Sequence, residues 1–313
     1  MKFTLKRIVV AVAALVAVSG CAPSSYHINN PSVSNIAYQQ KSEQAFSPLT
    51  ITDNRGNEMF SSGILPAQLK LGSAPLDPIS FLTQNTVKEL KSRGINMDFT
   101  PAGGIDVTVN KYRMRNYRSN GFSPFITFTM LSADVKTNDG TKRITAFIKR
   151  GKVPVWSFEE VIQPTMNEPM GILVKEFSAK LNALLYKHSI SDQQVDKLIN
   201  TVNNGGNYLD VYQLGFGNNK KAVDELKRLC RSSDEYIRLA AISSLGILGS
   251  LESFDFLKAL YAKSSNWSDK AMTLKSIGDL DTPEGLQFMK DARKDFQKDK
   301  AKAWSDELLS LYL

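Results

Sequence analysis

The sequence predicts an α+β domain, an antiparallel sheet with two helices, followed by an all-α array of about four stacked helical hairpins. Two observations lead to this prediction. Between residues 46 and 190, segments with alternating apolar residues accompany two segments that carry apolar residues at helical spacing. Between residues 191 and 313, pairs of short helical segments recur about every 30 residues, which indicates a stacked architecture.

The first 21 residues have the pattern of an export signal. A basic start without acidic residues is followed by an apolar run over 8–18. This run is much shorter than the roughly 20 residues that a helix needs to span a bilayer. It ends in Val18-Ser19-Gly20-Cys21, which resembles the lipobox of bacterial lipoproteins. The resemblance implies removal of residues 1–20, a diacylglycerol thioether on Cys21, and an acyl chain such as palmitate on its new amine. An ordinary signal peptide with a chance cysteine is the alternative.

Residues 21–45 are polar, contain Pro, Ser and Asn, and show no periodic apolar pattern. We therefore expect a flexible tether with an end-to-end distance of about 25–30 Å, which would let the folded part stand off the membrane. Ala22, rather than Asp, follows Cys21. Under the lipoprotein resemblance, this implies a lipid-anchored location on the periplasmic face of the bacterial outer membrane.

The formal net charge of +8 is unevenly distributed. Residues 46–190 hold 18 Lys and Arg against 12 Asp and Glu, whereas residues 191–313 hold 17 against 18. This modest basic excess suits an anionic surface such as lipid headgroups better than nucleic acid. Export to the envelope argues further against a nucleic-acid partner.

Cys230 is the second of two cysteines. If Cys21 carries lipid, Cys230 has no disulfide partner within the chain. It follows the apolar helical stripe Val223, Leu226 and Leu229, which predicts a small core residue. A reactive thiol or an intermolecular bridge is the alternative.

The elements of residues 46–190 are expected in a simple order. They are a strand at 49–55, a helix from Pro78 to a stop at Gly94, strands at 105–112 and 124–136, a return strand through 144–148, and a helix at 168–187. Asn138-Asp139-Gly140 predicts a tight hairpin turn, because Asp-Gly tolerates positive φ angles. Two helices on one face of the sheet would bury all the apolar stripes.

The opening strand at 49–55 ends in Asp53-x-Arg55. This short motif is similar to the opening of YajG-type lipoproteins. The order of elements over about 46–188 also resembles auxiliary lipoproteins of ABC transporters and of lipopolysaccharide export. The resemblance implies a non-enzymatic binding or assembly domain.

The region 191–313 contains internal repeats. Leu214-Gly215, Leu245-Gly246 and Ile277-Gly278 recur at intervals of 31 and 32 residues. Each unit carries two short helices, which cannot bury their apolar faces alone and must stack on their neighbours. Ser191-x-x-Gln194 supplies a capping box that starts the array.

This pattern resembles HEAT or HEAT-like repeats. The resemblance is strongest where Asp234, Arg238 and Ala240-Ala241 stand in family positions together with the Leu-Gly pairs. It covers roughly residues 191–313, and its first and fourth units are degenerate, as expected of end caps. An unrelated helical bundle is the alternative.

The sequence carries no motif for catalysis or metal binding. His27 lies in the tether and His188 at a helix end, so they cannot form a metal cluster with the cysteines. The patterns GxSxG, HExxH, GxGxxG and the P-loop do not occur, and no cofactor is expected. The adjacent Glu159 and Glu160 would point to opposite faces of a strand rather than converge on a substrate.

Lys111, Arg113, Arg115 and Arg118 form a basic run. The first three would share one face of a strand, with the same parity as the apolar residues 105, 107 and 109. Either a β-bulge intervenes, or the strand runs beyond the helices that cover it. A projecting basic hairpin would be an interaction patch for a protein partner or anionic lipid. A solvated strand end that discourages edge pairing is the alternative.

These features favour a non-enzymatic scaffold lipoprotein of the bacterial envelope. It would bind membrane lipid through acylated Cys21 and other envelope proteins through its helical repeats. A place as an accessory subunit of an outer-membrane complex, in a secretion system such as type IV or in a flagellum, is the leading hypothesis. A lipid- or glycan-binding auxiliary lipoprotein in envelope transport is one alternative. A cryptic periplasmic hydrolase is another, because carboxylates from distant loops would leave no local motif.

Overall fold

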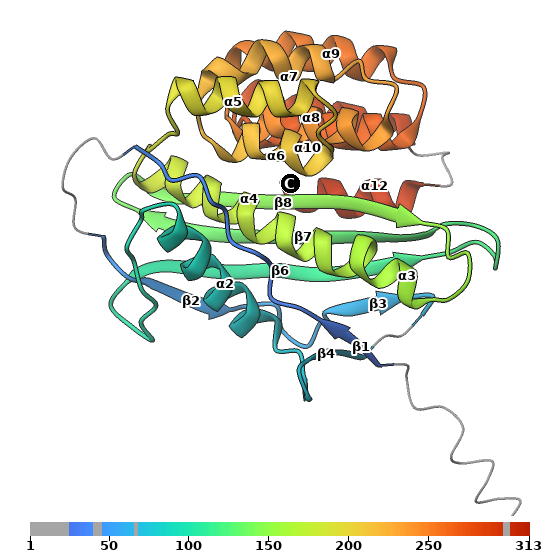
Figure 1. The fold of residues 1–313 in the computed structure, drawn as a ribbon, viewed down its shortest axis with the longest axis horizontal. Helices are drawn as coiled ribbons and strands as arrows, with labels where there is room; N and C mark the ends of the chain where they lie inside the picture. Colours follow the sequence, from blue (N-terminus) through green and yellow to red (C-terminus); the bar gives the residue numbers. More distant parts are fainter. Residues whose placement is uncertain (1–24, 40–45, 66–67, 297–300) are drawn as a thin grey trace, which may run out of the picture.

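The computed structural model describes residues 25–39, 46–65, 68–296 and 301–313, and its ribbon is shown in Figure 1. The α/β region contains β1 (Ser25–Ile28), β2 (Leu49–Asp53), β3 (Ser61–Gly63), β4 (Gln68–Leu71), β5 (Ala74–Pro75), α2 (Pro78–Ser92), β6 (Ile105–Tyr117), β7 (Phe125–Thr137), β8 (Gly140–Lys152), α3 (Glu159–Ile162), the π-helical turn η1 (Gln163–Asn167) and α4 (Glu168–Leu185).

The repeat region follows with helices throughout its described part. It contains α5 (Asp192–Asn203), α6 (Tyr208–Phe216), η2 (Lys220–Ala222), α7 (Val223–Leu229), α8 (Glu235–Ile247), η3 (Leu251–Ser253), α9 (Phe254–Lys263), α10 (Trp267–Asp279), α11 (Pro283–Ala292), η4 (Arg293–Phe296) and α12 (Lys302–Leu309). The predicted capping box at the start of α5 is present, with Ser191 and Gln194 bonded reciprocally.

The main sheet is mixed, so the prediction of an antiparallel sheet holds for part of it. Its order is β2-β6-β7-β8, and β3 also pairs with β6. The pairs β6–β7 and β7–β8 are antiparallel, whereas β2 and β3 run parallel to β6. The physical reason is the connection, because the chain leaves β2, passes through α2 and returns into β6 in the same direction. The short strands β1, β4 and β5 form a second, smaller sheet.

A β-bulge reverses the facing of side chains along β6. The register shifts between Val109, which pairs with Ala133, and Lys111, which pairs with Ser132. The extra residue places Tyr112 on the buried face in the place of Lys111. A β-bulge is one of the two reasons that the sequence allows for the parity that Lys111, Arg113 and Arg115 share with the apolar residues 105, 107 and 109, and this explanation is confirmed.

The segment 25–39 packs on the body of the protein, which contradicts the prediction of a flexible tether for these residues. Ile28 and Tyr38 are buried, and the Tyr38 hydroxyl donates a hydrogen bond to the Phe216 carbonyl at 2.8 Å. The backbone N–H of Ser34 donates to the carboxylate of Glu89, which is buried on α2 and needs such donors. Residues 21–24 and 40–45 of the predicted tether lie outside the described residues.

The repeated Leu-Gly pairs mark the places where successive helices meet. A Cβ atom on Gly215 of α6 would come within 2.7 Å of Ser244 on α8, and one on Gly246 would come within 2.7 Å of Ser276 on α10. Glycine lets these helices approach more closely than any residue with a side chain would. The interval of about 31 residues is therefore the stacking interval of the second helices α6, α8 and α10.

The last helix leaves this stack and packs on the sheet. Trp304 of α12 places its ring 5.1 Å from the ring of Phe128 on β7 and 4.8 Å from Tyr117 on β6. It also lies 5.4 Å from Trp267 of α10. The expected array of four stacked hairpins therefore ends differently, because α12 buries its apolar face, including Trp304, against the sheet.

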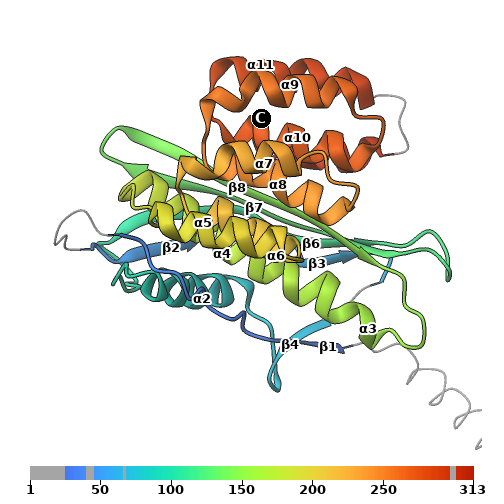
Figure 2. The ribbon, with the colours of Figure 1, turned by 45° about the horizontal axis from the view of Figure 1, so that its top comes forward.

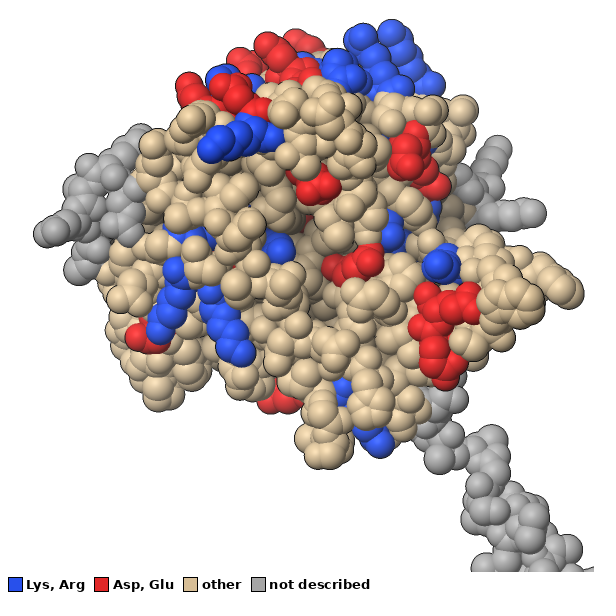
Figure 3. Space-filling view, in the orientation of Figure 1, with Lys and Arg blue, Asp and Glu red and all other residues tan. Residues whose placement is uncertain are grey.

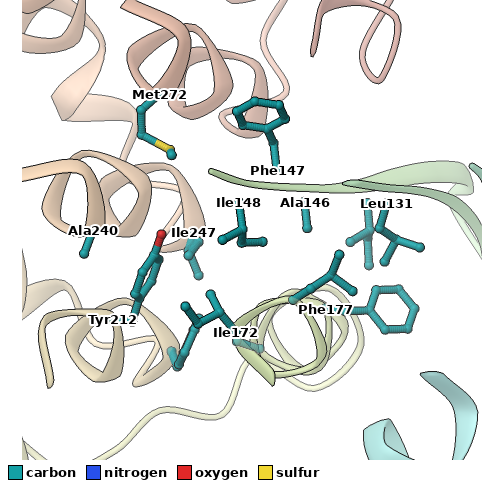
Figure 4. Packing of buried hydrophobic residues seen from close by; sticks show 14 of the residues in the cluster. Leu131, Ala146, Phe147, Ile148, Ile172, Phe177, Tyr212, Ala240, Ile247 and Met272 are labelled. Atoms are coloured by element: carbon teal, nitrogen blue, oxygen red, sulfur yellow. The ribbon is translucent and has the colours of Figure 1, made fainter. Parts of the chain in front are cut away.

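The α/β region and the repeat region share a continuous hydrophobic core. In Figure 4, Ala146 and Ile148 of β8 point toward α4, while Phe147 points the other way, toward Met272 of α10. Figure 2 shows the result, with α2 below the sheet and the repeat helices above it. An edge strand with two apolar faces needs a covering element on each face, and the repeat helices supply the second.

Candidate interaction surfaces

Three large apolar side chains project into water from loops at one end of the main sheet. Phe122, Val155 and Trp156 are 95%, 70% and 91% exposed. The first lies in the turn between β6 and β7, and the other two lie in the loop between β8 and α3, at the right-hand end of the sheet in Figure 1. We call these three residues the apolar tip.

Glu160 holds the loop that carries Trp156. Its carboxylate accepts hydrogen bonds from the backbone N–H groups of Val155, Trp156 and Ser157 at 3.1, 2.9 and 3.0 Å. These donors, that of Val155 foremost, hold the pKa of Glu160 below its ordinary value. Glu159 and Glu160 begin helix α3, so the prediction that they lie on a strand is wrong. Glu160 fixes the shape of a loop.

The turn that carries Phe122 is also built from internal hydrogen bonds. The Ser123 hydroxyl oxygen accepts from the backbone N–H groups of Ser119 and Asn120, both at 3.0 Å. The Asn120 side chain accepts from the N–H of Phe122 at 2.9 Å. Arg118, a member of the predicted basic patch, donates to the Ser123 carbonyl at 3.1 Å. These bonds fix the backbone of the turn from which the exposed Phe122 projects.

Phe158 connects the apolar tip to the beginning of the described chain. Its ring lies 4.9 Å from that of Phe125, the first residue of β7, and 5.0 Å from that of Tyr26 on β1. Tyr26 is five residues after Cys21. Cys21 itself, the predicted lipidation site, lies outside the described residues.

The remaining members of the predicted basic patch contact the C-terminal helix. Arg113 and Arg115 both form ion pairs with Glu307 of α12, the latter at 2.9 Å. Lys111 donates to the Ser310 hydroxyl at 2.8 Å. The prediction that these residues form a projecting basic hairpin is therefore wrong. This part of β6 binds the C-terminal end of the same chain, because the bulge turns the three cations toward α12.

A buried charge cluster joins the two regions. Lys275 of α10 contacts Glu176 of α4 at 2.6 Å and Asp279 at 2.7 Å, and all three side chains are at most 1% exposed. Lys180 of α4 contacts Asp279 at 2.7 Å and Glu176 at 2.8 Å. The two cations and two carboxylates balance. Tyr312, near the C-terminus, donates to Asp279 at 2.9 Å and completes the cluster.

The cluster keeps Lys275 and Asp279 in their charged forms. Burial disfavours the ammonium form of Lys275, but the carboxylates of Asp279 and Glu176 outweigh burial and raise the pKa of Lys275 well above its ordinary value. Burial likewise opposes ionisation of Asp279, yet Lys180 and Lys275 lower its pKa. A group held ionised in this way is a poor general acid or base near neutral pH.

A pocket of about 300 Å³ opens beside the cluster, between β8, α4 and the repeat helices. Its charged lining residues are already paired. Lys142 contacts Asp281 at 3.0 Å, Arg143 contacts Asp134 at 2.9 Å, and Lys180 contacts the cluster. A charged ligand would have to displace an ion pair to bind here.

The outer helices of the repeats carry a shallow groove. It lies between α9 and α11 and is lined by Phe254, Lys258, Glu284, Phe288 and Asp291, among others. Phe254 and Phe288 are half-buried, and the Lys258 ammonium lies 5.1 Å from the Phe254 ring. Figure 3 shows small groups of both charge signs on the face in view, without a continuous patch of either.

Cys230 and His188 are both buried. Cys230 is a buried free thiol, and burial raises its pKa to about 12, as expected for a core residue. His188 is buried near the rings of Phe46 and Tyr186. Within the described residues, no group of three His, Cys, Asp or Glu side chains could hold a metal ion, and no helix is both long and apolar enough to cross a membrane.

Comparison with known proteins supports the central repeats. A family model described as HEAT repeats matches residues 211–278, from α6 to α10. The HEAT-like interpretation of the sequence is therefore confirmed for this part. A search of curated proteins found no match. The lipobox and the YajG-type resemblance stay predictions.

Sequence reasoning missed the apolar tip. Its signal was an aromatic or branched residue placed within a turn-forming segment, as in Asn120-Gly121-Phe122-Ser123-Pro124 and Val153-Pro154-Val155-Trp156. Such segments favour loops, and a large apolar residue within a loop is a candidate for contact with another surface.

Proposed function

We propose that this protein is a non-enzymatic, lipid-anchored docking protein of the bacterial envelope, with its partner bound on the outer helices of the repeats. HEAT repeats commonly mediate protein–protein contacts. The proposal places the chain as an accessory subunit of an outer-membrane complex, such as that of a secretion system or a flagellum.

The observation that carries this proposal is that the inner helices of the repeats pack on the α/β region, which leaves the outer helices exposed. In many solenoids the inner helices form the concave surface that binds partners. Here that layer is covered, because α6, α8 and α10 face α4 and β8. The outer helices α5, α7, α9 and α11 remain for a partner, and the α9–α11 groove offers half-buried aromatic rings beside charges of both signs.

The groove has the composition of a protein-binding site. Aromatic side chains that keep part of their surface in water can bury it against an apolar side chain of a partner. Lys258, Glu284 and Asp291 around them supply a polar rim that would select an oppositely patterned partner. The occupant that we propose is a segment of another envelope protein.

Native purification in mild detergent tests the proposal. The wild-type protein is expected to elute with one defined envelope component, and Lys258→Glu combined with Phe288→Ser should remove that component. Lys197→Glu on α5 is the matched control, because it changes the same charge on an outer helix away from the groove. A monomeric wild-type protein, or a component that all three proteins retain, would contradict the proposed docking site.

Membrane attachment is tested by Cys21→Ala. The variant should leave the membrane fraction after a salt wash, because two or more acyl chains give stable anchoring and none would remain. Persistence of this variant in the washed membranes would show that something other than the lipid holds the protein.

A further inference from the structure

We propose that the apolar tip formed by Phe122, Val155 and Trp156 inserts into the interface of the lipid bilayer, as a second membrane contact beside the lipidated Cys21. This inference uses the lipid anchor of the proposed function, but it does not depend on the protein partner. In this arrangement, the end of the main sheet that carries the tip faces the membrane.

Hydrogen bonds within the two loops keep the tip exposed. Two aromatic rings that are more than nine-tenths exposed are unusual on adjacent loops of a protein surface. Neither loop can readily fold back to cover its ring, because Glu160 holds one backbone and Ser123 the other. Aromatic side chains held out from a rigid scaffold suit the bilayer interface, where Trp in particular is enriched.

The position of the anchor places lipid next to the tip. Tyr26 contacts Phe158, which is two residues after Trp156. The five residues from Tyr26 back to Cys21 span at most about 18 Å when fully extended. Residues 25–39 pack on the body, so only residues 22–24 separate Cys21 from the described part of the chain. An acylated Cys21 would therefore hold this end of the sheet at the bilayer surface.

Charge around the tip identifies the kind of lipid surface. Arg118 and Lys152 lie at the bases of the two loops, and Glu159 and Glu160 follow in α3. The two cations are offset by two carboxylates, so no net positive charge draws the tip to anionic headgroups. We therefore expect insertion into zwitterionic bilayers, with little dependence on salt.

Fluorescence of Trp156 in vesicles tests this inference. The acylated full-length mature protein is incorporated into vesicles of phosphatidylethanolamine and phosphatidylcholine, with or without bromine on the acyl chains. Trp156 should show a blue-shifted emission that brominated lipid quenches. Trp156→Phe removes this signal and leaves that of Trp267 and Trp304, which are half-buried. Phe122→Ser combined with Val155→Ser should reduce the quenching, because less apolar surface would hold the tip in the bilayer.

Leu251→Ser is the matched control. Leu251 is 59% exposed, but it begins η3 two residues after Gly249, which lines a pocket with Lys142 at the opposite end of β8 from the tip. Its replacement should leave Trp156 quenching unchanged. All these positions are exposed, so the variants are expected to fold, and circular dichroism verifies this.

Two results would overturn the inference. The first is a vesicle-bound, acylated protein whose Trp156 emission is neither shifted nor quenched, which would leave the lipid anchor intact and reject the tip. The second is a shift in emission that follows protein density in the vesicles and ignores bromine, since a second copy of the chain would then be covering the tip. A missing protein partner would affect neither readout.

Discussion

Lys275 of α10 and Glu176 of α4 form a fully buried ion pair, with Nζ and Oε1 2.6 Å apart. This contact crosses from the repeat region to the α/β region, and Asp279 and Lys180 complete a neutral cluster around it. Buried charges are costly unless they are paired, so the cluster ties the two regions to one relative arrangement. A displaced repeat region would leave charges buried without partners.

We predict that Lys275→Met destabilises the protein by about 3–5 kcal/mol, because it leaves two carboxylates against one cation in a buried site. The measurement is urea unfolding at neutral pH. Adding Glu176→Gln to Lys275→Met restores the charge balance, and the double variant should recover part of the loss. The exposed Lys142, paired with Asp281, is the control, since Lys142→Met should cost about 1 kcal/mol or less. Equal costs at the two lysines would contradict the prediction.

The cluster also predicts a dependence of stability on pH. Asp279 has a lowered pKa in the folded protein, so its contribution is present above its unfolded value of about 3.9 and is lost as pH falls through the folded pKa. Lys275 has a raised pKa, so its contribution is present below about 10.4 and is lost as pH rises through the folded value. Wild type and Asp279→Asn should differ in urea midpoint near pH 7, and this difference should shrink as pH falls below about 4. A constant difference over this range would refute the assignment.

Arg150 of β8 contributes a second link between the regions. Its guanidinium lies 4.0 Å from the ring centroid of Tyr208 on α6 and 3.9 Å from that of Tyr236 on α8. Arg150→Lys keeps the charge but loses the planar group that stacks on both rings, so it should cost about 1–2 kcal/mol in urea unfolding. Arg143→Lys, at an exposed ion pair of the same strand, should cost less than about 1 kcal/mol. If Arg150→Lys unfolds at the same urea concentration as the wild type, stacking of the guanidinium on the two rings adds little to the stability of the protein.

Close packing of the second helices predicts an unusual glycine effect. Gly246→Ala should destabilise by about 1–3 kcal/mol through overpacking against the Ser276 backbone, although alanine favours helices by about 1 kcal/mol. Gly121→Ala is the control, since its Cβ would meet no atom within 4 Å. Thermal unfolding measures both. Stabilisation by Gly246→Ala would mean that the helices can separate without cost.

Cys230 is expected to be chemically silent in the folded protein. Burial raises the pKa of its thiol to about 12, and the thiolate is the reactive form. In a Cys21→Ser variant, where Cys230 is the single thiol, a disulfide reagent should react slowly at pH 8 and rapidly in urea. Fast reaction without denaturant would support the alternative of a reactive thiol.

Local elements were predictable because their signals are short in sequence. Pro78 begins α2 where predicted, with Asp77 capping its first turn, and the Asn138-Asp139-Gly140 turn joins β7 to β8. The π-helical turn before α4 carried no comparable signal. The parallel pairing of β2 with β6 depends on how a crossover connects them, which no local pattern states.

The candidate surfaces were less predictable than the elements. Lys111, Arg113 and Arg115 were visible as a basic run, but their partners come from α12, about 200 residues away in the chain. A run of charge in a sequence does not show whether water or a distant part of the chain will surround it, because charged side chains are mostly exposed. The tip was missed because exposure is a property of the fold.

By itself, the sequence determined the periodic elements and the stacking interval, since helical spacing, capping and the Leu-Gly pairs act between near neighbours. Tertiary structure alone decided which surfaces remain free. In the folded protein the inner helices of the repeats pack on β8, the basic run of β6 binds α12, and Trp156 is exposed to water. The physical reason is that burial depends on what else must cover an apolar face, and here the covering elements come from distant parts of one chain.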